Sequence, residues 1–167
     1  MANQKRQTEF LLLLDRCQGT IMRLCLVHTD RQPENVKDLY QDIVCNLWES
    51  YPRIRHKKNI RTWVYRVALY TAYMHHRSKK RTVSFIDFDD NLYETVAGDS
   101  GNEMIERLYS LIDKLDTEDR TLLFLYIDKV PQREIAKILG TTEANINQRI
   151  TRLKKKLKIM NENEDEQ

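Results

Sequence analysis

A stretch of the chain without acids carries most of the residues that could do chemistry. From Arg53 to Arg81 there are ten Lys and Arg residues, three His residues and no Asp or Glu, although the whole 167-residue protein has a net charge of only +3. Such a basic stripe favours a polyphosphate partner, and aromatic rings beside it can stack on unpaired bases. A solvated surface is the alternative, but such surfaces usually mix both signs of charge. The aromatic residues of the stretch are Trp63, Tyr65, Tyr70 and Tyr73.

Charge divides the rest of the chain into blocks. Residues 82–106 carry seven acids and no Lys or Arg, whereas residues 144–161 carry six Lys and Arg residues and no acid. The last six residues carry a net charge of −4. Two basic blocks with an acidic block between them predict two nucleic-acid contacts joined by a linker.

The second basic block lies on a predicted helix-turn-helix. A short helix starts near Pro131 and ends at Gly140, and Thr141 or Thr142 caps the longer helix that follows. In this motif the second helix lies in the major groove, where amides pair with adenine and cations with guanine or phosphate. An ordinary helical hairpin with a solvated basic side is the alternative. The outward side chains of the longer helix are Asn147, Gln148, Thr151, Arg152 and Lys155.

Three helices are predicted to position the first basic block. Apolar side chains recur at helical spacing in residues 7–27, 34–50 and 60–78, and Pro52 ends the second run, so that residues 53–59 form a loop. The side of the third helix that is expected to face inward carries Ile60, Trp63, Val64, Val67, Ala68, Thr71 and Met74. The opposite side carries Arg61, Arg66, Tyr70, Tyr73 and Arg77.

The acidic block is predicted to be a linker. Residues 82–103 lack helical periodicity, and the polar run 98–102 is typical of a flexible tether. Helical spacing resumes at Glu103, and Asp116 or Thr117 caps a further helix. The sequence therefore predicts an all-α fold of two small helical domains joined by an acidic linker. Apolar residues indicate that part of the linker packs on a domain or a partner: Val83, Phe85, Ile86 and Phe88.

The sequence contains no pattern typical of an enzyme. It has no cluster of metal-ligand residues, no phosphate-cradling glycine loop and no Ser or Cys nucleophile elbow. A nucleic-acid enzyme is therefore disfavoured, and we expect no catalytic residue, metal or cofactor. The three cysteines lack CxxC spacing and indicate reduced thiols packed in helices. Because no apolar run approaches the roughly 20 residues that span a bilayer, we expect a cytoplasmic protein without membrane insertion.

Three segments of the chain resemble regions of bacterial sigma factors. The segment LDTEDRTLLFLYIDKVPQREIAKILGTTEANINQRITRLKKKL is similar to region 4. DLYQDIVCNLWE resembles region 2.2, and NIRTWVYRVALYTAYMHHRSKK resembles regions 2.3 and 2.4. Their order and spacing, without a recognisable region 1 or 3, match the extracytoplasmic-function group (group IV) of the sigma-70 family. The resemblance covers roughly residues 8–80 and 104–158.

This resemblance implies a transcription initiation factor that binds RNA polymerase core and directs promoter recognition and opening. It implies four parts, which are region 2 at 1–81, the linker at 82–103, region 4 at 104–160 and an acidic tail at 161–167. The implied partners are promoter DNA, the β′ clamp helices and β flap of the polymerase, and an anti-sigma factor as a further candidate. Region 2.2 of the family docks on the clamp helices, here through Asp38, Gln41 and Asp42.

Two sets of DNA-binding residues are also implied by the resemblance. The loop before region 2.3 is implied to contribute a pocket for a flipped base. For Trp63, packing in the core and direct contact with a base are equally good interpretations of its position. The residues implied at the minus-10 element are Arg53, Arg55, Lys57, Lys58, Asn59, Arg61, Trp63, Arg66, Tyr70, Tyr73 and Arg77. Those implied at the minus-35 element are Asn147, Gln148, Arg149, Thr151, Arg152 and Lys155.

Region 4 departs from the family pattern in its second helix. Asn147-Gln148 stands where Lys or Arg followed by Ser is common, and Ala144-Asn145 stands where Gly-Thr is common. These departures leave the helix-turn-helix intact and concern base preference, and we expect Gln148 or Asn147 to read adenine. The alternative function is a conventional helix-turn-helix regulator with residues 1–80 as a sensing or dimerising domain. That alternative does not explain why an acid-free basic helix follows DLYQD.

Overall fold

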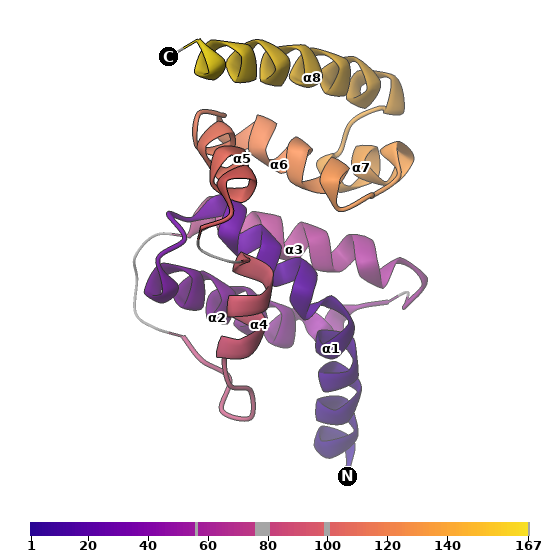
Figure 1. Ribbon diagram of the computed structural model, residues 1–167. Coiled ribbons are helices and arrows are strands. Elements are labelled where there is room, and N and C mark those ends of the chain that lie inside the picture. Colours follow the sequence, from indigo (N-terminus) through magenta and orange to yellow (C-terminus); the bar gives the residue numbers. More distant parts are fainter. Residues whose placement is uncertain (56, 76–80, 99–100, 167) are drawn as a thin grey trace. The chain divides into compact units, whose positions relative to one another are not determined.

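The computed structural model describes residues 1–55, 57–75, 81–98 and 101–166. All regular secondary structure in these residues is helical (Figure 1), which confirms the predicted all-α fold class. The chain divides into two compact units, Met1–Ala97 and Gly98–Gln167.

The first unit is built around three packed helices, α1 (Ala2–His28), α2 (Pro33–Ser50) and α3 (Ile60–Met74). Two short 3₁₀ turns follow α2: η1 (Tyr51–Arg53) overlaps the predicted loop only at Arg53, and η2 (Lys57–Asn59) lies inside that loop. Burial of these apolar faces supplies more stability than helix propensity does. The largest fully buried side chains of the unit are Phe10, Ile21, Met22, Leu24, Leu26, Leu39, Ile43 and Leu47.

A tight turn connects α1 to α2. Thr29 donates its hydroxyl hydrogen to the carbonyl of Cys25 at 2.7 Å and accepts the backbone N–H of Arg31 at 3.2 Å. Pro33 then begins α2, at a position where a helix leaves the backbone N–H unpaired in any case.

The buried arc of helix α3 is shifted from the one that the sequence predicts. Both α1 and α2 pack on this helix, and Tyr65 and Leu69 are buried, whereas Ile60, Trp63 and Val67 of the expected stripe are only partly buried. Met74, which the stripe places inward, is instead 56% exposed. The helix ends at Met74 rather than at residue 78, and residues 76–80 lie outside the described residues.

The predicted linker contains a helix that its sequence did not reveal. Helix α4 (Asp90–Ala97) packs against α1, and the Asp89 carboxylate accepts the N–H of Leu92 at 2.9 Å near its start. A helix of about two turns is too short for its periodicity to stand out, and tertiary packing stabilises it. Residues 82–97 therefore belong to the first unit instead of forming a free linker.

The second unit comprises α5 (Glu103–Asp113), α6 (Thr117–Ile127), α7 (Gln132–Leu139) and α8 (Glu143–Asp165). Side chains of Asn102, Asp116 and Thr142 accept backbone N–H groups at the starts of α5, α6 and α8. Gly140 follows α7 with a left-handed φ of 68°, which ends that helix as predicted. The buried side chains around which these helices pack include Ile112, Leu122, Leu125, Ile135, Ile146, Ile150 and Leu153.

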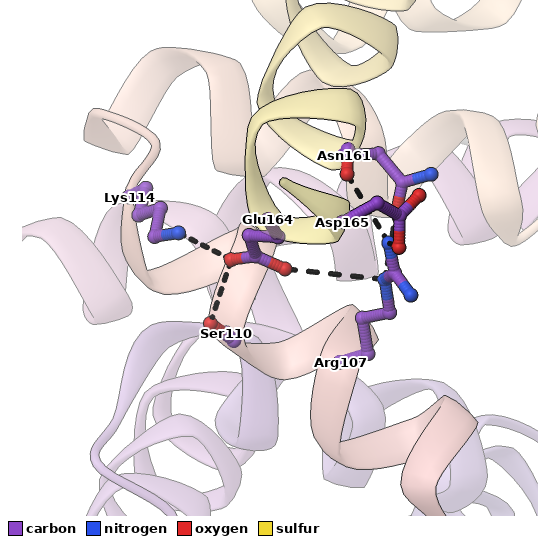
Figure 2. Close-up of polar contacts among 6 residues, drawn as sticks. All are labelled: Arg107, Ser110, Lys114, Asn161, Glu164 and Asp165. Carbon is purple, nitrogen blue, oxygen red and sulfur yellow. Dashed lines mark hydrogen bonds and ion pairs between the residues drawn. The ribbon is translucent and has the colours of Figure 1, made fainter. Parts of the chain in front are cut away.

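The C-terminal acids extend α8 instead of forming a separate tail. Figure 2 shows the end of α8 held on α5, where Arg107 Nε donates to Asn161 Oδ1 at 2.8 Å and Lys114 pairs with Glu164. The hydroxyl of Ser110 donates to the same Glu164 carboxylate at 3.2 Å. Acids near a helix C-terminus interact unfavourably with the helix dipole. The contacts with Arg107, Ser110 and Lys114 offset this cost and stabilise the end of α8.

Candidate nucleic-acid interface

Four side chains on the outer face of α8 line one shallow hollow of about 470 Å³. The buried residues Ile146, Ile150 and Leu153 hold the opposite side of the helix in the core, which turns this face toward solvent. The hollow combines two amides, a hydroxyl and a guanidinium, which suits hydrogen bonding to base edges and phosphates. Its lining residues are Asn147, Gln148, Thr151 and Arg152, all of them in the predicted minus-35 set.

The two other residues of that set are placed differently. Arg149 is half-buried, and its guanidinium lies 3.4 Å from Glu118 in the first turn of α6. Lys155 is exposed but does not line the hollow. The structure therefore brings four of the six residues together and turns Arg149 toward a neighbouring helix.

The outer face of α3 carries exposed rings and cations. Tyr70 is 65% exposed and Tyr73 is 43% exposed, as the sequence predicts for an outward face. Arg61 and Arg66 are exposed on the same helix. Tyr73 is not isolated, because its ring packs edge-on against His28 with the ring centroids 6.0 Å apart.

A hollow of about 400 Å³ lies between α2 and α3. Arg53, Arg66 and Tyr70 bring two cations and an aromatic ring to it, and Asn46 and Glu49 bring hydrogen-bonding groups from α2. Its size and chemistry suit an unstacked base with its phosphates, because rings stack on bases and cations attract phosphates. The remaining lining residues are Ser50, Val67 and Thr71.

The loop before α3 is exposed along most of its length. The predicted contacts Arg53, Arg55, Lys57, Lys58 and Asn59 are all exposed to solvent, and Lys57 pairs with Glu9 of α1 at 3.2 Å.

Two residues of the predicted minus-10 set remain, Trp63 and Arg77. Trp63 is half-buried, with its ring centroid 6.4 Å from that of Tyr51, so it takes part in packing and remains partly exposed. Arg77 lies outside the described residues.

The three predicted polymerase contacts lie on α2 with different surroundings. Asp38 and Gln41 are half-buried. Asp42 is only 14% exposed, and its carboxylate accepts a hydrogen bond from Nδ1 of His75 at 2.9 Å. This hydrogen bond connects the middle of α2 to the residue that follows α3.

The described residues offer neither a metal site nor a reactive thiol. No group of three or more His, Cys, Asp or Glu side chains is arranged to hold a metal ion in the part of the chain that the structure describes. Burial raises the pKa of the Cys17 thiol to about 12 and that of Cys25 further, so both stay protonated at neutral pH. None of the described helices has the length and apolar character needed to cross a membrane.

Each of the two units matches a known protein-family model. Residues 13–82 match the family model for Sigma-70 region 2, and residues 105–157 match the model for Sigma-70 region 4. The chain belongs to the sigma-70 family. It is a sigma factor for transcription initiation, and its partners are RNA polymerase and promoter DNA. The pairing of these two regions is typical of the extracytoplasmic-function group, and sigma factors are regulators rather than enzymes.

A solved structure shares the fold of this sigma factor. The structure of CnrH in complex with the cytosolic domain of CnrY superposes with a TM-score of 0.71 at 20% sequence identity. The match covers 93% of this chain and 89% of that chain.

Several residues near the hollow between α2 and α3 were not predicted from the sequence as part of the site. Asn46 and Glu49 line the hollow between α2 and α3, His75 holds Asp42, and Arg81 donates to both Asn46 and Glu49. Polarity of α2 near DLYQD is a weak signal for Asn46 and Glu49. No local signal marks His75 or Arg81, because their partners lie more than thirty residues away.

Proposed function

We propose that the outer face of α3 and the loop before it hold the minus-10 element as an unpaired strand. The observation that carries this proposal is the hollow lined by Arg53, Arg66 and Tyr70. Taking a base out of the stack costs a few kcal/mol, and stacking on a ring and pairing of phosphates with cations offset this cost. Trp63, which is half-buried, takes part in this contact as well.

We further propose that α8 reads the minus-35 element in the major groove. The hollow lined by Asn147, Gln148, Thr151 and Arg152 supports direct contact with base edges. Lys155 then binds a phosphate, and Arg149, held near Glu118, orients α8 on α6 in addition to reaching DNA.

For the polymerase we propose two contacts. Asp38, Gln41 and Asp42 of α2 bind the β′ clamp helices, and region 4 binds the β flap. Support comes from the half-exposed positions of Asp38 and Gln41 on a helix whose inner face is packed in the core. Asp42 acts partly by positioning α3, because its carboxylate is engaged by His75.

Two further aspects follow from the family. A sigma factor that works with RNA polymerase at promoters acts in the cytoplasm, and we propose that location here. An anti-sigma factor is a further proposed partner, because the structurally similar CnrH is held in a complex with the cytosolic domain of CnrY.

Run-off transcription tests these assignments directly. Purified core polymerase is combined with the wild-type protein, with Asp38→Ala or with no added protein, and transcripts are read from genomic fragments. We expect promoter-specific transcripts with the wild type and fewer with D38A. Failure of the wild type to bind core would overturn the polymerase contacts, and a stable sequence-specific duplex complex without polymerase would favour a conventional helix-turn-helix regulator.

A further inference from the structure

Residues 81–93, called the strap below, run along α2 in the opposite direction to that helix. Arg81 begins the strap beside the C-terminal part of α2, donating to Asn46 Oδ1 at 3.0 Å and to Glu49 Oε1 at 2.8 Å. Tyr93 ends it beyond the N-terminus of α2, where its hydroxyl donates to the carbonyl of Arg31 at 3.0 Å.

Aromatic contacts hold the middle of the strap on α2. The ring of Phe85 packs edge-on against Trp48 with centroids 4.9 Å apart, and the ring of Phe88 packs edge-on against Tyr40 at 5.4 Å. The Lys37 ammonium lies 5.9 Å from the Phe88 ring. Edge-to-face pairs of this kind are favourable beyond the area that they bury.

The strap lies directly beside a residue of the proposed polymerase-binding surface. Gln41 and Lys37 of α2 line a hollow of about 310 Å³ whose other walls belong to the strap. A polymerase helix that contacts Gln41 closely would meet these strap residues, which are Thr82, Val83, Ser84, Ile86, Asp87 and Phe88.

The strap is held by contacts that can open without unfolding the unit. No side chain of residues 82–97 is fully buried, in contrast to the packed interiors of α1, α2 and α3. Segments with few buried apolar contacts open locally at low free energy. The strap therefore makes defined contacts with α2 and can still separate from that helix.

We propose that the strap is an autoinhibitory cover that competes with RNA polymerase for the α2 surface. This inference rests on the proposed docking of α2 on the polymerase. While the strap is closed, the binding-competent fraction is small, and the apparent affinity for core falls in proportion to that fraction. Core binding displaces the strap from Gln41 and Lys37.

Affinity for core polymerase measures the competition. Phe88→Ala removes the ring that packs on Tyr40, and we expect roughly 5- to 10-fold tighter binding of core than for the wild type. Phe88→Leu keeps most of the apolar volume and should give a smaller gain. Glu94→Gln, an exposed change in α4, serves as the matched control and should leave the affinity unchanged.

Hydrogen exchange on the wild-type protein provides a readout that does not depend on a variant. The backbone N–H of Ile86 donates to the carbonyl of Val83 at 3.0 Å, and the backbone N–H of Tyr93 donates to the carbonyl of Asp89 at 3.0 Å. We expect residues 84–93 to lose protection when core polymerase binds, whereas α2 gains protection.

The outcomes separate this inference from the proposed function. If the wild type fails to bind core, the docking of α2 itself is wrong. If the wild type binds core but F88A binds equally or less tightly, and residues 84–93 keep or gain protection, the strap is no competitor and this inference is overturned.

Discussion

Nδ1 of His75 lies 2.9 Å from Oδ2 of Asp42 and joins the end of α3 to the middle of α2. The two side chains are 20% and 14% exposed, so the hydrogen bond between them is largely shielded from water. Asp42 belongs to the proposed polymerase surface, and α3 carries the proposed surface for the promoter strand. The hydrogen bond therefore fixes the position of one surface relative to the other within region 2.

Loss of this pair should weaken the first unit. We expect His75→Ala to lower the free energy of unfolding by about 1 kcal/mol, because it removes the hydrogen bond on a mostly buried carboxylate. Urea unfolding followed by tryptophan fluorescence measures this unit alone, since Trp48 and Trp63 are the two tryptophans of the chain. Arg16→Ala changes an exposed residue of α1 and serves as the control. Equal unfolding midpoints for H75A and R16A would show that the pair contributes nothing.

Truncation of Tyr70, the more exposed of the two exposed tyrosine rings on α3, should impair promoter opening. We expect Tyr70→Ala to reduce run-off transcription from a duplex promoter about 10-fold, because stacking of one base is worth about 1–3 kcal/mol. On a template with a pre-melted minus-10 element the loss should shrink, since the base is already unstacked. Tyr70→Phe retains the ring and should stay near the wild type. An equal loss on both templates would argue against a role in opening.

Base preference at the minus-35 element should depend on two amides. We expect the double substitution Asn147→Ala and Gln148→Ala to relax preference at one promoter position, because a good bidentate contact is worth about 1–3 kcal/mol of discrimination. Selection of holoenzyme on a library randomised in the minus-35 element measures the profile. Lys155→Ala, outside the hollow, should weaken binding evenly over all sequences. An unchanged profile for the double variant would contradict the assignment.

The attachment of α8 to α5 should depend on pH. The hydrogen bond from Lys114 is the main cause that lowers the pKa of Glu164 in the folded chain (Figure 2). A lowered pKa means that the ionised carboxylate stabilises the fold above the unfolded value of about 4.3 and loses this effect as the pH falls through the folded value.

Hydrogen exchange at the end of α8 measures this dependence. At neutral pH we expect amides 158–165 to be better protected in the wild type than in Glu164→Gln, and the difference should disappear as the pH falls through the lowered pKa of Glu164. Glu162→Gln alters a neighbouring exposed acid and should resemble the wild type at every pH. A difference that persists unchanged in acid would rule out this ionic contribution.

Much of the fold was predictable because its signals are local. The caps at Asp116 and Thr142, the end of α7 at Gly140 and the amphipathic stripes each depend on residues within one or two turns. Helix α4 escaped because its two turns become stable only by packing on α1.

The site shows the same division. Exposure of Tyr70 and the shared outward face of Asn147 and Gln148 follow from helical periodicity. The turn of Arg149 toward Glu118 does not, since it depends on how closely α6 approaches α8.

By itself the sequence determined the helical character of the chain, its two basic surfaces and the order of the motifs that mark a sigma factor. Only the tertiary structure decided that His75 holds Asp42 and that the strap lies over α2 rather than forming a free linker. Local patterns report which side of a helix is apolar. They do not report which distant segment packs there, because that choice depends on the complementary shapes and charges of surfaces that meet only in the folded chain.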